Sequence, residues 1–238
     1  MITVVSGRIG AGKSLHMVWL IRRAVEQGNC VRTNIYLDYK QVGRSIGRRL
    51  RPWQIGPVSE DDDPKSIPIG DRRGHGSRRT LVVLDEALNW FQSTQGKDER
   101  KKPWGEWLRQ SDKLGQDVFF IAQNFERTAK WIRELAQVSI EIVPFGDLKF
   151  LFLRLRWIFP PVRRLYLAIS RDVRTGQLLG TRCRAYTSDI WRLYDTSATF
   201  GFQAASSAFV GSVPPAFRLP RWPFYALAFF VLVWLILL

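Results

Sequence analysis

The sequence predicts an α/β fold: a mainly parallel β-sheet flanked by helices, an antiparallel β appendage and a C-terminal transmembrane helix. Three observations support this prediction. A glycine-rich loop joins an apolar strand to an apolar helix within residues 2–27. Strand-like and helical segments then alternate up to about residue 145, which is typical of a parallel sheet with helices on both faces. Finally, residues 222–238 contain no charged side chain.

The first part of the chain supplies the elements of the parallel sheet. The apolar run 2–5 predicts a buried strand, residues 13–27 a helix and residues 31–35 a second strand. Further on, "TLVVLDEALNWF" is a strand that runs into a helix, "DVFFIAQN" is a third strong strand, and "VSIEIVPF" is another strand after a helix at 128–137. Residues 41–79 are rich in Pro, Gly, Arg and Asp, and we interpret them as a long polar insertion that is only partly ordered.

The pattern changes after residue 146. The segments "LKFLFLRLRWIF", "RRLYLAIS" and "GTRCRAYT" are strand-like and follow one another without helices, and "DVRTGQ" is turn-like between the last two. They predict a β-rich appendage at 147–187 within a domain that covers residues 1–195. Residues 196–221 are rich in Ser, Ala, Gly and Pro, and we expect them to form a linker.

Residues 222–238, "WPFYALAFFVLVWLILL", form the predicted transmembrane segment. As a helix it would be about 25 Å long, close to the roughly 30 Å of a bilayer's hydrocarbon core. Its apolar residues cover every face, which a half-exposed helix would not tolerate, so a buried core helix is the weaker alternative. Because Arg218 and Arg221 precede it, the positive-inside rule predicts a cytoplasmic location for the domain before it.

The charge of the chain suggests an anionic partner. Lys and Arg number 36 against 21 Asp and Glu, a net charge of +15. Such an excess suits nucleic acid or an anionic membrane surface, and it also promotes plain solubility. The two cysteines, Cys30 and Cys183, are far apart and without metal-ligand spacing. A disulfide framework is therefore excluded, and a reducing compartment fits.

The glycine-rich loop "GRIGAGKS" matches G-x-x-x-x-G-K-[ST], the pattern of a phosphate-binding P-loop. Glycines let successive backbone N–H groups converge on a phosphate, and the following helix contributes the positive end of its dipole. Lys13 would reach the β- and γ-phosphates, and the Ser14 hydroxyl would ligate Mg²⁺. The sequence thus predicts a P-loop NTPase that uses ATP and Mg²⁺, with these nucleotide-binding residues: Gly7, Arg8, Ile9, Gly10, Ala11, Gly12, Lys13, Ser14 and Leu15.

A second motif fits the same chemistry. In "LVVLDE" four apolar residues precede Asp85 and Glu86, which places both acids at the C-terminal end of a strand. Asp85 is the predicted Walker B partner of Mg²⁺, and Glu86 would accept the proton of the attacking water. An acid directly after the aspartate favours a hydrolase over a kinase or a binding module.

Other polar residues are less decisive. Gln123 ends a third strand, where it would sense the γ-phosphate or be a solvated loop residue. His16 lies on the apolar face of the P-loop helix and is interpreted as a packing residue, whereas His75 has no assignment. The arginine finger that motors of this kind use is not identifiable, and five candidates stay open: Arg127, Arg171, Arg174, Arg182 and Arg184.

Several blocks together resemble the zonula occludens toxin (Zot) family, the assembly and export ATPases of filamentous bacteriophages (inoviruses). They are the P-loop near the start of the chain, "LVVLDEA", "WLRQSDKLGQDVFFIAQN", "RLYDTS" at 192–197 and the single apolar segment. The resemblance implies an ATPase of the additional-strand, catalytic-glutamate type in the bacterial inner membrane. It also implies a homo-oligomeric ring as the active form, with phage coat and assembly proteins and the phage DNA complex as partners.

Two other interpretations stay open. The first is a soluble DNA-translocating or packaging ATPase whose basic face follows nucleic acid. The second is a nucleotide-gated adaptor without enzymatic activity. The apolar segment 222–238 argues against the soluble motor, and Glu86 argues against the adaptor. The positive charge does not decide, because it suits lipid headgroups as well as DNA.

Overall fold

The computed structural model describes residues 1–70, 78–86, 102–126, 128–147, 149–150, 153–154 and 165–194. All of these residues belong to one of the two compact units of the chain, Met1–Ser206. The elements are, in order, β1 (Ile2–Ser6), α1 (Lys13–Glu26), β2 (Cys30–Thr33), α2 (Tyr39–Ser45), β3 (Ile55–Pro57), the 3₁₀ turn η1 (Pro64–Ser66), β4 (Thr80–Leu84), α4 (Lys102–Gln110), β5 (Gln116–Ile121), α5 (Lys130–Leu135), β6 (Val138–Pro144), the 3₁₀ turn η4 (Phe145–Asp147), β7 (Lys149–Phe150), β8 (Leu153–Arg154), β9 (Leu165–Asp172), β10 (Leu178–Ala185) and α7 (Ser188–Trp191).

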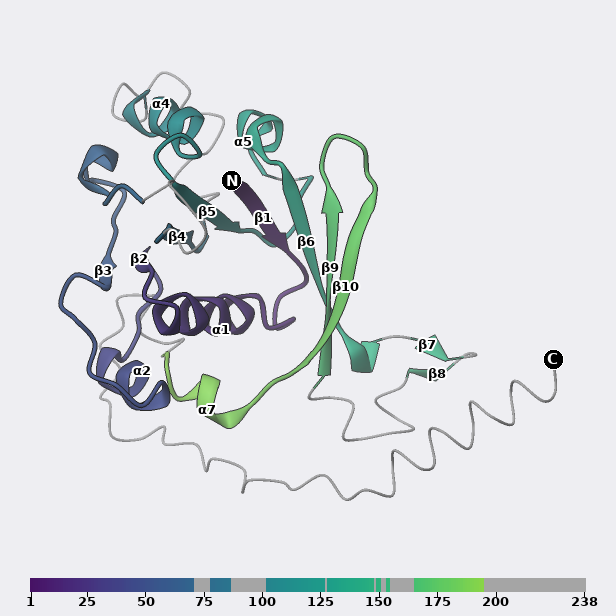
Figure 1. Ribbon diagram of the computed structural model, residues 1–238. Coiled ribbons are helices and arrows are strands. Elements are labelled where there is room, and N and C mark those ends of the chain that lie inside the picture. The colour runs from purple at the N-terminus through teal and green to yellow at the C-terminus, as the bar shows by residue number, and fades with distance from the viewer. Residues whose placement is uncertain are drawn as a thin grey trace. The chain divides into compact units, whose positions relative to one another are not determined.

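An eight-stranded sheet with the order β10-β9-β6-β1-β5-β4-β2-β3 forms the centre of the molecule (Figure 1). Strands β6, β1, β5, β4, β2 and β3 are parallel to one another, which confirms the predicted parallel sheet. Strand β5 lies between β1, which leads into the glycine-rich loop, and β4, which ends before Asp85. This inserted strand is the feature that the additional-strand type of P-loop ATPase implies.

Helices cover both faces of the sheet because successive strand residues point to opposite sides. In β1, Val5 packs with α1, α2 and α7 on one face, whereas Val4 packs with α4 and α5 on the other. All five residues of β1 and of β4 are buried, as expected for central strands of a parallel sheet. The P-loop helix α1 therefore lies on the first face, directly against the sheet.

The interpretation of residues 41–79 as a polar, partly ordered insertion is wrong for much of its first part. Within it, α2 continues to Ser45, and β3 pairs in parallel with β2 and extends the sheet by one strand. The helix is stabilised at its start by Asp38, whose side chain accepts bonds from the backbone N–H groups of Lys40 and Gln41. The three-residue strand β3 is too short to show a period in the sequence, which explains why it was not expected.

The predicted antiparallel appendage is confirmed in its second half. Strand β9 pairs antiparallel with β6, and β10 pairs antiparallel with β9, so this hairpin extends the main sheet (Figure 1). Its turn has the predicted place: the Asp172 carboxylate accepts bonds from the backbone N–H groups of Arg174 and Thr175. Strands β7 and β8 form a separate short pair, and most of "LKFLFLRLRWIF" lies outside the described residues.

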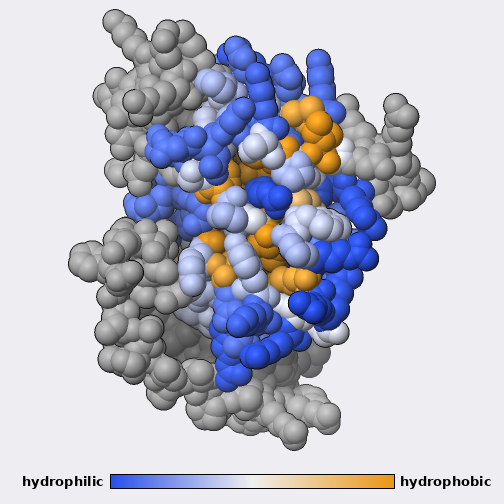
Figure 2. Space-filling model, turned by 90° about the vertical axis from the view of Figure 1, so that its left-hand side faces the viewer, coloured by the Kyte–Doolittle hydropathy of each residue, from blue (hydrophilic) through white to orange (hydrophobic). Residues whose placement is uncertain are grey.

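The side of the molecule on which β3 forms the sheet edge is mainly hydrophilic. Figure 2 shows this side, with apolar residues in small groups between many hydrophilic ones. The composition agrees with the net charge of +15. Within the described residues, no helix has the length and apolar character needed to cross a membrane. The predicted linker at 196–221 and transmembrane segment at 222–238 lie outside the described residues and stay predictions.

His16 is a packing residue, as the sequence indicated. Its side chain is buried, and its Nδ1 lies 3.0 Å from the Tyr166 hydroxyl. Burial lowers the pKa of His16 to about 4, and the positive charges of Arg184 and Arg182 contribute. The folded protein therefore resists protonation of this imidazole.

We expect the free energy of unfolding to fall as the pH drops from about 6.5 to about 4. In that range the unfolded chain binds a proton at His16 and the folded chain does not, which costs about 3 kcal/mol for this shift in pKa. Urea denaturation at pH 7 and pH 4.5, for the native protein and His16→Gln, measures the effect. An equal pH dependence in both proteins would show that His16 is not responsible.

Candidate functional site

The loop at residues 7–12 joins β1 to α1 and has the backbone that a P-loop needs. Gly7 has φ 154° and Gly12 has φ 83°. A Cβ atom at Gly7 would lie 2.6 Å from the backbone oxygen of Ile142 in β6, and one at Gly12 would collide with the ring of Tyr186. Glycine is therefore required at both positions, as the motif indicated. The loop also carries Ala11, which is buried, and Ile9, which is exposed.

Backbone oxygens of this loop hold the Lys13 side chain in place over the loop. Its ammonium donates hydrogen bonds to the backbone oxygens of Gly7 at 2.9 Å and Arg8 at 3.0 Å. Burial lowers the pKa of Lys13, and the nearby Asp85 carboxylate partly opposes this effect. The side chain is thus fixed where the loop's N–H groups and the start of α1 favour an anion.

The structure brings the two predicted Mg²⁺ ligands together from positions 71 residues apart. Ser14, in the first turn of α1, donates a hydrogen bond from its hydroxyl to Asp85 Oδ2 at 2.9 Å. Burial raises the pKa of Asp85, and the bond from Ser14 is the strongest opposing influence. A hydroxyl and a carboxylate at this separation are the hard oxygen donors that Mg²⁺ prefers, so both residues fit the ion that the motifs imply.

Glu86 follows Asp85 in a backbone conformation that is unusual for its residue type. It has φ 53°, and its backbone N–H donates to Asp85 Oδ1 at 2.9 Å. Its side chain is exposed. Left-handed backbone at a residue other than glycine is costly and clusters at functional sites. The position beside Asp85 fits the expected general base, a role that stays a prediction.

Gln123 lies beside the start of the P-loop. It follows β5, and its backbone oxygen accepts a hydrogen bond from the Gly7 N–H at 3.4 Å. Its side chain is exposed. The structure therefore places Gln123 with Gly7 at the ends of two adjacent parallel strands, where ligands bind in such sheets, and its sensing role stays a prediction.

The arginine-finger candidates lie in different places. Arg171 forms an ion pair with Glu141 at 3.3 Å, and Arg174 lies in the turn of the β9–β10 hairpin. Arg182 and Arg184 share one face of β10 because they are two residues apart on a strand. Arg127 lies outside the described residues.

Asn34 is a site residue that the sequence analysis missed. Its side-chain amide makes two hydrogen bonds to the backbone of Asp85. The Nδ2 atom donates to the Asp85 oxygen at 2.9 Å, and the Oδ1 atom accepts from the Asp85 N–H at 2.7 Å. Asn34 directly follows β2, the strand next to β4. The criterion that selected Asp85 and Gln123, a polar residue at the end of a strand, did not select Asn34, because the strand predicted at 31–35 runs past it, whereas β2 ends at Thr33.

We expect Asn34→Ala to weaken Mg²⁺-dependent nucleotide binding, because Asp85 loses the amide that orients its backbone. Supporting residues of metal ligands typically contribute about tenfold or more in affinity, and unfolding should become easier by about 1–3 kcal/mol. Calorimetric titration with a non-hydrolysable ATP analogue, with and without Mg²⁺, measures the effect. Asn34→Asp, which keeps only the acceptor, should be intermediate, and native affinity in Asn34→Ala would contradict this role.

Two tyrosines near the end of the described chain also reach the site. The Tyr186 hydroxyl donates to the backbone oxygen of Ala11 in the P-loop at 2.5 Å. Burial and then the Asp85 carboxylate raise the pKa of Tyr194 to about 12. Tyr194 belongs to the segment "RLYDTS", and it is placed by a bridge to Leu37. No local pattern links these residues to a loop about 175 positions earlier.

The model of the family described as Zonular occludens toxin (Zot) matches residues 1–143 of the chain, more than half of its 238 residues. The chain belongs to the Zot family. The match includes the P-loop, Asn34, Asp85, Glu86 and Gln123, whereas Tyr186 and Tyr194 lie beyond it. With the P-loop, the adjacent acids and the inserted strand β5, this Zot chain is a P-loop NTPase by fold and by motif.

Similar curated proteins come from phages. The chain is 36% identical over 134 residues to the Gene 1 protein of Enterobacteria phage I2-2, a match that covers 55% of the chain and 36% of that protein. It is 30% identical over 212 residues to the Gene 1 protein of Salmonella phage IKe, which covers 83% of the chain and 56% of that protein. The chain thus spans between about a third and three fifths of the length of these relatives.

Among solved structures, the N-terminal domain of zonular occludens toxin from Neisseria meningitidis matches with a TM-score of 0.47 at 15% identity. That match covers 82% of the chain and 98% of the solved domain. The genome packaging NTPase B204 from Sulfolobus turreted icosahedral virus 2, in complex with ATP-gammaS, matches with a TM-score of 0.45 at 13% identity, over 78% of the chain and 97% of that protein.

Proposed function

We propose that the chain is a membrane-anchored ATPase that couples ATP hydrolysis to the assembly and extrusion of filamentous phage through the bacterial inner membrane. The observation that supports it most is the meeting of four residues at the P-loop, namely Lys13, Ser14, Asp85 and Glu86. Membership of the Zot family and the likeness to Gene 1 proteins of phages support the biological setting.

The site residues suggest how hydrolysis would proceed. The loop N–H groups and the Lys13 ammonium bind the β- and γ-phosphates. Ser14 and Asp85 would hold Mg²⁺, which neutralises phosphate charge as the reaction advances. A water molecule attacks the γ-phosphorus, its proton passes to the Glu86 carboxylate, and the bond from phosphorus to the β–γ bridging oxygen breaks. ADP and inorganic phosphate are the products, and Glu86 releases its proton to solvent.

The proposed location is the inner membrane, with the domain 1–195 in the cytoplasm. Its support is the charge-free segment 222–238 and the basic residues before it. The proposed partners are phage coat and assembly proteins and the phage DNA complex, and the proposed active form is a homo-oligomeric ring. One of the candidate arginines, Arg171, Arg174, Arg182 or Arg184, would reach a neighbouring subunit's nucleotide in such a ring.

The soluble packaging ATPase remains the second candidate, because the net charge of +15 suits DNA as well as lipid headgroups. One experiment separates the two. A phage that lacks its own copy of this gene is supplied with the native chain, with Lys13→Ala or with a chain ending at residue 221, and released particles and membrane fractionation are measured. Under the proposal, phage particles are released only when the native chain is supplied, and the native chain sediments with the membranes. Full release by the shortened chain, or recovery of the native chain in the soluble fraction, would favour the packaging ATPase.

A further inference from the structure

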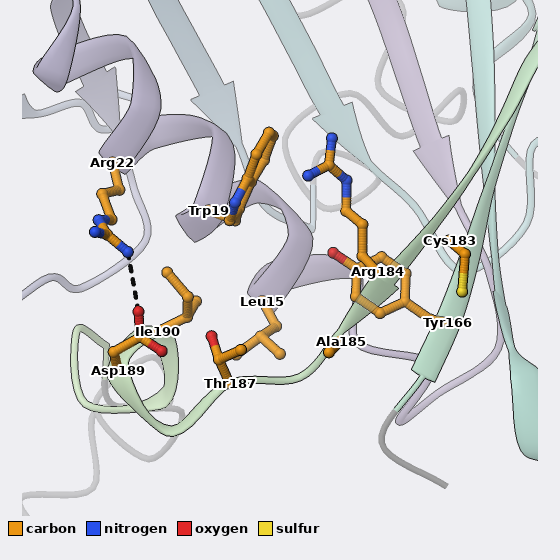
Figure 3. A pocket seen from close by; sticks show the side chains of 10 residues that line it. All are labelled: Leu15, Trp19, Arg22, Tyr166, Cys183, Arg184, Ala185, Thr187, Asp189 and Ile190. Atoms are coloured by element: carbon orange, nitrogen blue, oxygen red, sulfur yellow. Dashed lines mark hydrogen bonds and ion pairs between the residues drawn. The ribbon is translucent and has the colours of Figure 1, made fainter. Parts of the chain in front are cut away.

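A cavity of about 370 Å³ lies between α1, the β9–β10 hairpin and α7. Figure 3 shows its walls: Leu15 and Trp19 come from α1, Tyr166 from β9, Arg184 from β10, and Thr187 and Ile190 from the chain that follows. Its volume falls in the range of small-molecule sites. Its lining combines apolar and aromatic groups with the Arg184 cation and the Arg22–Asp189 ion pair. The mechanism proposed above does not use this cavity.

The cavity begins where the P-loop ends. Leu15, in its wall, directly follows Ser14 of the Mg²⁺ site. On the opposite wall, Ala185 and Thr187 flank Tyr186, whose hydroxyl donates to the Ala11 oxygen and whose ring leaves no space for a side chain at Gly12. One wall is therefore the P-loop helix, and the other is attached to the P-loop by Tyr186. A molecule held by the loop would have this cavity as its neighbour.

The sheet order gives the direction in which a nucleotide would lie. Asp85, Glu86 and Gln123 follow β4 and β5, which are on one side of β1. The terminal phosphate has to be on that side, because the attacking water and its base act there. The remainder of the nucleotide then extends to the other side of β1, where β6, β9 and β10 lie. The cavity is on this second side.

The chemistry of the walls suits a nucleobase. The Arg184 guanidinium carbon lies 3.4 Å from the centre of the Trp19 ring, a close cation–π contact. A base offers a flat π face for such a stack and ring nitrogens that accept hydrogen bonds from a guanidinium.

We propose that this cavity is the nucleoside subsite: it receives the base and ribose of the nucleotide whose phosphates the P-loop binds. Arg184 and Trp19 contact the base, and Tyr186 fixes the position of the β10 end of the cavity relative to the P-loop through its bond to Ala11. This inference rests on the proposed function only in requiring that the P-loop binds nucleotide phosphates. It assigns to Arg184 a role in its own subunit's nucleotide site, in place of a role as arginine finger.

The test compares ligands with and without a nucleoside. Full-length protein in detergent is titrated calorimetrically with Mg²⁺ and either ADP, ATPγS or inorganic tripolyphosphate. The variants are Arg184→Ala, Arg184→Gln, which keeps a long polar side chain in the wall, and the matched control Arg51→Ala. Arg51 also stacks on a tryptophan, with its guanidinium carbon 5.8 Å from the centre of the Trp53 ring, but it does not line the cavity.

We expect the native protein to bind ADP and ATPγS with higher affinity than their phosphates alone would give, because the nucleoside adds contacts in the cavity. Arg184→Ala and Arg184→Gln should weaken both nucleotides about tenfold or more and leave tripolyphosphate within about twofold, well below that stacking effect. Arg51→Ala should change none of them. Equal losses for nucleotides and tripolyphosphate, or unchanged nucleotide affinity in both Arg184 variants, would overturn the subsite.

Titration of the native protein alone also tests the subsite, and this test does not depend on whether a variant folds. If it binds tripolyphosphate but gains nothing from the nucleoside of ATPγS, the phosphate site stands and the subsite is wrong. If it binds neither tripolyphosphate nor nucleotides, the P-loop assignment itself fails, and the subsite fails with it.

Discussion

Lys13→Ala is expected to abolish nucleotide binding and hydrolysis together. The Lys13 ammonium lies over the P-loop, held by the backbone oxygens of Gly7 and Arg8. There it would form charge-assisted hydrogen bonds to phosphate oxygens, each contributing about 1.5–3 kcal/mol. Loss of two such bonds corresponds to a fall in affinity of about 10²–10⁴-fold. Calorimetric titration with ATPγS and Mg²⁺ and a phosphate-release assay measure both effects.

Two controls separate loss of the phosphate contact from damage to the loop. Lys130→Ala removes an ammonium from the exposed surface of α5, where it pairs with Glu134, and should leave binding and hydrolysis unchanged. Lys13→Arg keeps a positive charge and should keep part of the affinity if the loop backbone is intact. Unchanged ATPγS affinity in Lys13→Ala would show that residues 7–14 are not a phosphate-binding loop.

Glu86→Gln is expected to retain nucleotide but to hydrolyse it about 10²–10⁴ times more slowly. The P-loop, Lys13 and the Ser14–Asp85 pair are unchanged in this variant, so the affinity for ATP should stay near native. What is lost is the carboxylate that accepts the proton of water, about 3–5 kcal/mol of the activation barrier. Because glutamine has the shape of glutamate, the left-handed backbone at φ 53° should also be preserved.

The measurement for Glu86 is a paired one: the dissociation constant of ATP and the rate of hydrolysis in the same detergent. Asp85→Ala should differ, since it removes the acceptor of the Ser14 hydroxyl and weakens Mg²⁺-dependent binding as well. Glu134→Gln, a change on the exposed surface of α5, should leave both quantities unchanged. Hydrolysis by Glu86→Gln within about threefold of native, far less than a general base contributes, would assign the base to another residue.

In phage production, the two variants should also differ when native protein is present. A ring that contains Glu86→Gln subunits would hold ATP without hydrolysing it and stop, so release of particles should fall below the native level. Lys13→Ala subunits bind no nucleotide and should interfere less. Equal release in both mixtures would argue that the active form is not a ring whose subunits act together.

Much of the candidate site was predictable from short stretches of sequence. Gly7, Gly12 and Lys13 are recognisable because the backbone geometry of a phosphate loop restricts which residues fit, and the structure shows the collisions that a side chain would cause at both glycines. Asp85 and Gln123 were found because apolar strands are visible in sequence and their C-terminal ends form ligand sites in parallel sheets. Asn34 follows the same rule after β2, but the strand predicted at 31–35 includes Asn34 and so placed it inside the strand.

The sequence by itself determined the strand–loop–helix unit, the alternation of strands and helices, and the acids at the end of β4. These features depend on neighbouring residues: the period of apolar side chains, and the φ angles that glycine permits. Only the tertiary structure decided which strands are adjacent, that β3 joins the edge of the sheet, and that Asn34 binds the backbone of Asp85. It alone brought Tyr186 to Ala11 and Arg184 to Trp19. The physical reason is that these contacts join residues far apart in the chain. They form because the apolar faces of separate helices and strands pack on one sheet, and a local sequence pattern does not show which faces will pack together.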